Sequence, residues 1–105
     1  MSFDYKHTPI YKSCLKGNME KVEKILEGRI NEFILADGLQ GACKGGHKEI
    51  IQLMIEEGIY SWNYGLLGAC EGGHKEIIQL MIEKGARDWN RGLQGACSGG
   101  NKEII

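Results

Sequence analysis

The chain has 105 residues, which suits a single domain, and its 13 basic and 14 acidic side chains give a formal net charge of -1. This balance argues against a nucleic-acid binder, which normally carries a basic excess, and no apolar run approaches the ~20 residues of a membrane span. Residues 1–7 lack the apolar core of a signal peptide. We therefore expect an intracellular, cytoplasmic protein that binds neither nucleic acid nor membrane.

Two helices are predicted at the start of the chain, near residues 9–16 and 18–28. In the second, Val22, Ile25 and Leu26 share an apolar face, whereas Lys21 and Lys24 make the other side polar. A helix with one apolar side suits the end unit of a repeat array, because the outer side of that unit meets water. We therefore interpret residues 1–37 as an N-terminal capping repeat.

Residues 38–64 and 65–91 are two copies of one 27-residue unit, identical at 20 of 27 positions. The copies read GLQGACKGGHKEIIQLMIEEGIYSWNY and GLLGACEGGHKEIIQLMIEKGARDWNR, and residues 92–105 (GLQGACSGGNKEII) are an incomplete further copy. A fixed period of this size predicts a solenoid, in which each unit buries its apolar face against its neighbours. The chain is thus predicted to be one all-α domain, residues 1–105, of stacked antiparallel helix pairs.

Each unit predicts a first helix, a Gly-Gly turn and a second helix. First helices are expected near residues 38–45, 65–72 and 92–99, and second helices near residues 47–57, 74–84 and 101–105. Gly68, inside a first helix, costs about 1 kcal/mol of helix propensity but lets a neighbouring helix approach closely. No β-sheet is expected, because the connections between units are too short to supply one.

The incomplete unit at residues 92–105 predicts an uncovered apolar surface at the C-terminal end of the stack. It has no lysine at the outward positions, and a solenoid end without a polar face leaves apolar surface in water. We expect a second copy of the chain to cover this end as a two-fold homodimer, or a longer array to continue it. The residues expected to be uncovered for self-association are Leu80, Met81, Ile104 and Ile105.

The repeated unit is similar to a known family. Its pattern A-C-x-G-G-H-x-E-I-I-x-L-M-I-E-x-G-A resembles the ankyrin repeat core, and Thr8-Pro9-Ile10-Tyr11 resembles the T-P-L-H signature of that family. The family repeat has 33 residues, so six are missing here, all from the connection that forms the projecting β-turn finger. The chain looks like a short-finger ankyrin variant of the kind found in large DNA viruses and protists. A viral origin would place it in the cytoplasm of a host cell.

The recurring Cys and His residues have two possible functional interpretations, a metal site and a catalytic dyad. Cys43 with His47, and Cys70 with His74, offer two ligands per repeat, whereas a structural zinc site uses four. Chemistry needs one site, but packing needs the same residue in every layer. We therefore predict no metal, no cofactor and no catalytic residue, with the histidines hydrogen-bonded locally in the turns. The cysteines predicted to be buried and reduced are Cys14, Cys43, Cys70 and Cys97.

Positions at which the near-identical repeats disagree are the predicted partner-binding residues, because packing already explains the residues that the repeats share. They fall into two rows on the first helices, four residues apart and hence on one helix face, and a third set in the turns. The rows are Gln40, Leu67 and Gln94, then Lys44, Glu71 and Ser98, and the turn set is Tyr60, Tyr64, Arg87 and Arg91. Neutral drift at solvated positions is the competing explanation.

The predicted function is a protein–protein interaction scaffold. In the ankyrin family, residues equivalent to the second row line a concave surface that contacts protein partners, so the resemblance implies binding through the first helices and the short turns. The alternative is a self-assembling structural array that associates through its C-terminal end.

Overall fold

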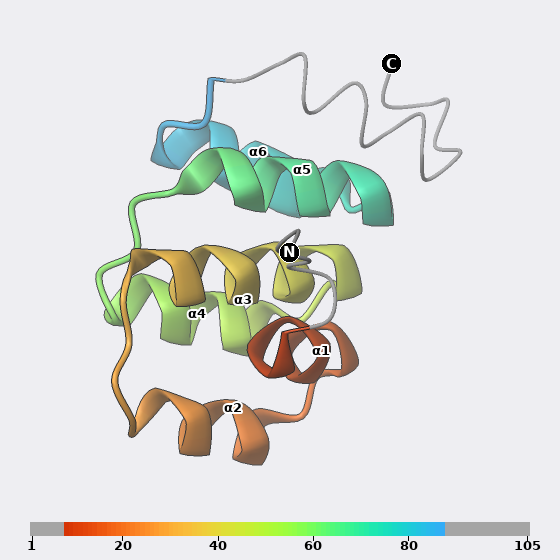
Figure 1. Ribbon diagram of the computed structural model, residues 1–105. Coiled ribbons are helices and arrows are strands. Elements are labelled where there is room, and N and C mark those ends of the chain that lie inside the picture. The colour runs from red at the N-terminus through yellow and green to blue at the C-terminus, as the bar shows by residue number, and fades with distance from the viewer. Residues whose placement is uncertain (1–7, 88–105) are drawn as a thin grey trace, which may run out of the picture.

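The computed structural model describes residues 8–87, and this part of the chain is all-helical (Figure 1). Its elements are α1 (Pro9–Lys16), α2 (Met19–Leu26), α3 (Glu32–Gly45), α4 (Lys48–Glu56), α5 (Trp62–Gly72) and α6 (Lys75–Lys84). No strand occurs within residues 8–87, so the predicted all-α class is confirmed there. No helix in this range is long and apolar enough to cross a membrane. The helices predicted near residues 92–99 and 101–105 lie outside the described residues.

The six helices form three consecutive pairs. The first helices α1, α3 and α5 pack side by side in chain order, and α2, α4 and α6 each pack against the first helix that precedes them (Figure 1). One apolar core runs through the three pairs, and its fully buried side chains include Leu39, Ile51, Met54 and Leu66. Each pair therefore buries its apolar side chains in a core that it shares with its neighbours.

The first helices begin and end where local chemistry allows. At the start of α1, the Thr8 hydroxyl accepts a hydrogen bond from Tyr11 N at 3.3 Å, and Pro9 occupies the first turn, where its missing N–H costs nothing. Gly17, Gly46 and Gly73 end the three first helices with φ values of 77°, 75° and 72°. Glycine adopts this left-handed conformation without steric cost, so the predicted glycine turn is confirmed.

Neighbouring first helices touch through their backbones. A Cβ atom on Gly41 would lie 2.5 Å from the Tyr11 carbonyl oxygen in α1, and one on Gly68 would collide with the Gln40 carbonyl oxygen in α3. Only a residue without a side chain fits at these two positions. The close approach predicted at Gly68 is therefore confirmed, and Gly41 repeats it one pair earlier.

Two helix starts were predicted wrongly. α3 begins at Glu32 instead of residue 38, because the Asn31 side chain accepts a hydrogen bond from Ile34 N at 2.9 Å and caps a helix six residues earlier. α5 begins at Trp62 instead of residue 65. Tyr64 consequently lies in the first turn of α5 and not in the connection between repeats. The predicted repeat boundaries after residues 37 and 64 fall inside these two helices.

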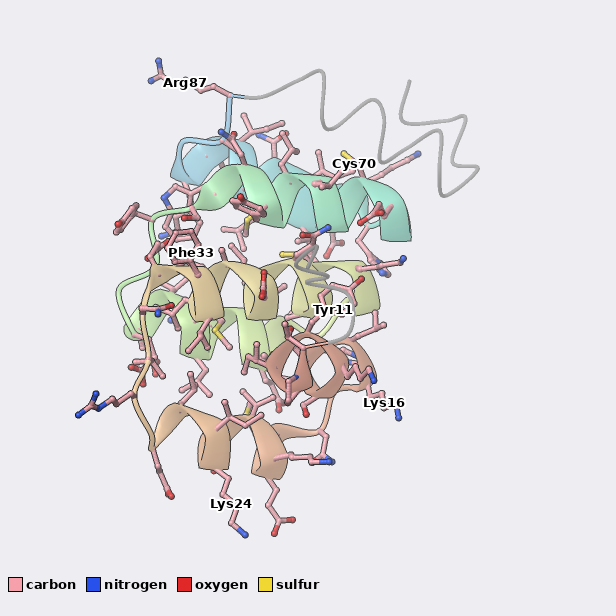
Figure 2. The ribbon with its side chains drawn as sticks, viewed as in Figure 1. Tyr11, Lys16, Lys24, Phe33, Cys70 and Arg87 are labelled. Carbon is pink, nitrogen blue, oxygen red and sulfur yellow. The ribbon has the colours of Figure 1, made fainter. Side chains whose placement is uncertain are left out.

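The predicted polarity of the first pair is confirmed. Val22 is fully buried, whereas Lys21 and Lys24 are exposed. Figure 2 shows Lys24 pointing away from the stack. The cysteine prediction is also confirmed within the described residues, since Cys14, Cys43 and Cys70 are buried free thiols. Cys97 lies outside those residues.

Candidate protein-interaction surface

One helix face of α5 carries three of the predicted partner-binding residues. Tyr64, Leu67 and Glu71 are spaced i, i+3 and i+7, so they project from the same side of the helix, and each is partly exposed. Lys44 is at the corresponding level of α3, one repeat before Glu71, and is also partly exposed. These four side chains form an accessible face on the first helices of the second and third pairs.

Gln40 does not belong to this accessible face, and its assignment was wrong. Its side chain is 0% exposed, and its Nε2 donates a hydrogen bond to Glu71 Oε1 at 3.2 Å. Residue spacing within one helix cannot show that Gln40 of α3 is covered where α3 packs against α5. Gln40 therefore contributes indirectly to the accessible face, because its hydrogen bond holds the Glu71 carboxylate in place.

A second accessible group lies where the chain enters the first helices. Tyr60 is 72% exposed, directly before α5, and Arg87 is exposed after α6. Phe33, in the first turn of α3, is 78% exposed and was not among the predicted partner-binding residues. Figure 2 shows Phe33 and Arg87 on the same side of the molecule. A signal was present, because Phe33, Tyr60 and Arg87 follow one another at the 27-residue period.

Hydrogen bonds from the first helices fix the backbone beneath this group. Glu32 Oε2 accepts bonds from Tyr60 N at 3.2 Å and Ser61 N at 2.8 Å. One pair later, Asn63 Oδ1 accepts a bond from Arg87 N at 2.8 Å. Tyr60 and Arg87 are thus presented on backbone that is already positioned, which lowers the ordering cost of binding.

The two histidines join neighbouring pairs, which corrects the prediction that they bond locally. His47 Nε2 lies 2.9 Å from the Leu15 carbonyl oxygen, and His74 Nε2 lies 3.0 Å from the Lys44 carbonyl oxygen. A carbonyl only accepts, so Nε2 is the donor in both bonds. Each ring lies against glycine, since a Cβ on Gly46 would be 2.8 Å from His74 Cε1. No group of three or more His, Cys, Asp or Glu side chains that could hold a metal occurs within residues 8–87.

The three buried thiols have raised pKa values, whereas a catalytic cysteine has a lowered one. Burial raises the pKa of Cys14 to about 12, and burial, with a smaller effect of Cys14, raises the pKa of Cys43. Burial first and then the charge of Glu71 raise the pKa of Cys70. A nucleophilic cysteine needs a lowered pKa, so these three thiols stay protonated at neutral pH and serve as small apolar side chains.

Two of the four predicted self-association residues, Leu80 and Met81, lie in α6, and they differ in exposure. Met81 was expected at the surface but is 0% exposed, because it packs into α5, where a Cβ on Gly65 would collide with its sulfur atom. Leu80 is partly exposed and lines a shallow cavity with Ile51 and Ile77, between α4 and α6. The remaining predicted site residues lie outside the described residues. They are Arg91, Gln94, Ser98, Ile104 and Ile105.

Comparison with known proteins gives no relative: no family model, curated protein or solved structure matches this chain.

Proposed function

We propose that this protein is an ankyrin-like solenoid that serves as an intracellular scaffold and binds a protein partner. The observation that carries the proposal is where the two near-identical repeats differ. Lys44 is replaced by Glu71 and Tyr60 by Arg87, and all four side chains are accessible. The shared residues between them build most of the core, although Ile59 and Ala86 differ and are both buried. Change at accessible positions over a largely shared core is typical of a binding surface carried by a repeat scaffold.

The partner would contact the accessible face and the exposed group of Phe33, Tyr60 and Arg87. Phe33 and Tyr60 supply exposed rings, which give large contact areas at low entropic cost, and Arg87 supplies a charged contact. These side chains lie on or beside helices whose backbones pack in direct contact. Partner binding therefore requires little rearrangement of the protein backbone. No cofactor, nucleic acid or membrane enters the proposal.

The self-assembling array is the weaker alternative. It was predicted to use Leu80, Met81, Ile104 and Ile105 at an uncovered end, and of these Met81 is instead buried against α5. Leu80 is partly exposed, and Ile104 and Ile105 lie outside the described residues. No observation within the described residues favours it over the scaffold.

The test is capture of partners from cells of the source organism, by proximity labelling with the full chain. The surface variant combines Lys44→Glu, Tyr60→Ser and Phe33→Ser. Glu71 is left intact because its removal would strip the buried Gln40 amide of an acceptor. The matched control combines Lys24→Glu, Gln52→Ser and Gln79→Ser, which alters three exposed residues on the second helices.

We expect the surface variant to lose proteins that the wild type and the control variant both label. Both variants should unfold within about 1 kcal/mol of the wild type, since exposed substitutions rarely cost more. Equal labelling by all three proteins would exclude this face as the binding surface. Absence of any reproducible partner, together with a mass in solution that grows with concentration, would favour the self-assembling array.

A further inference from the structure

We draw no further inference here: the strongest candidate, the surface patch formed by the exposed rings of Phe33 and Tyr60 where the chain enters α3 and α5, belongs to the partner-binding surface already proposed, and nothing in the structure shows what covers it.

Discussion

Asp37 is a carboxylate placed in the buried part of α3, where it is only 7% exposed. Burial raises the pKa of Asp37 above its ordinary value of 3.8, and a hydrogen bond from the Thr8 side chain opposes part of that rise. A raised pKa means that the folded protein binds this proton more tightly than the unfolded chain does. The contribution of Asp37 to stability is therefore most favourable at low pH and declines as the pH rises through the raised pKa.

Asp37→Asn should accordingly stabilise the fold at pH 7, because it removes a buried charge and keeps an oxygen that can accept from Thr8. Its effect should shrink when the pH is lowered to 4, where the wild-type carboxyl is increasingly protonated. Urea unfolding of both proteins at the two pH values measures this difference. Glu23→Gln, at an exposed position of α2, should change little. A destabilised Asp37→Asn at pH 7 would mean that the hydrogen bond from Thr8 outweighs the cost of burial.

At the scale of the helices, the contact between α3 and α5 sets two physical effects against each other at Gly68. Helix propensity alone favours alanine over glycine by about 1 kcal/mol. Packing opposes it, because the added Cβ would collide with the Gln40 carbonyl oxygen, which belongs to helical backbone and cannot turn aside. We expect packing to win and Gly68→Ala to lower the free energy of unfolding by about 1–3 kcal/mol.

Gly28→Ala is the matched control for that change. A Cβ there would have its nearest contact at 3.5 Å, from the Ile25 carbonyl oxygen, which is ordinary van der Waals distance. Its stability should stay within about 0.5 kcal/mol of the wild type or rise slightly. If chemical denaturation shows Gly68→Ala to be as stable as Gly28→Ala, the first helices are not held in backbone contact.

The sequence predicted which helices exist better than where they begin. Apolar periodicity and the glycine turns located all six described helices, since these signals are local, although the first unit has Gly17-Asn18 in place of Gly-Gly. The starts of α3 and α5 were missed, because the repeat alignment begins at Gly38 and Gly65, while the capping Asn31 has no equivalent asparagine one period later, where Gly58 stands.

The site was predicted in part for a similar reason. Disagreement between repeats identified Lys44 and Tyr60 as accessible positions. It could not reveal that Gln40 is covered at the junction of α3 and α5, because that burial depends on a neighbour 31 residues away. Phe33 was not predicted because it lies before the repeated unit that begins at Gly38, although it precedes Tyr60 by one 27-residue period.

At the scale of the whole molecule, the main contacts between helices of different pairs within residues 8–87 join α1 to α3 and α3 to α5, and the histidines add to this coupling. His74 joins the third pair to the second through the Lys44 carbonyl, and His47 joins the second pair to the first through the Leu15 carbonyl. In such a chain of units, each interface contributes its own share of the stability.

His74→Ala should therefore lower amide protection against hydrogen exchange mainly in α5 and α6, by an amount near the ~1 kcal/mol of one hydrogen bond. His47→Ala, its counterpart, should instead loosen α1 and α2. Hydrogen-exchange mass spectrometry distinguishes the two patterns. A uniform loss of protection in both variants would show that the three pairs unfold as one unit.

The contact between α1 and α3 and the contact between α3 and α5 are built from equivalent residues. This similarity bears on how the number of repeats can change during evolution. Gly41 meets the Tyr11 carbonyl as Gly68 meets the Gln40 carbonyl, and His47 and His74 bond the carbonyls four residues further on. A duplicated copy of residues 38–64 would find a fitting surface on each side without any compensating substitution. Unequal recombination between the two near-identical segments could therefore lengthen or shorten the chain by whole units, and each gain would extend the accessible face by one more row.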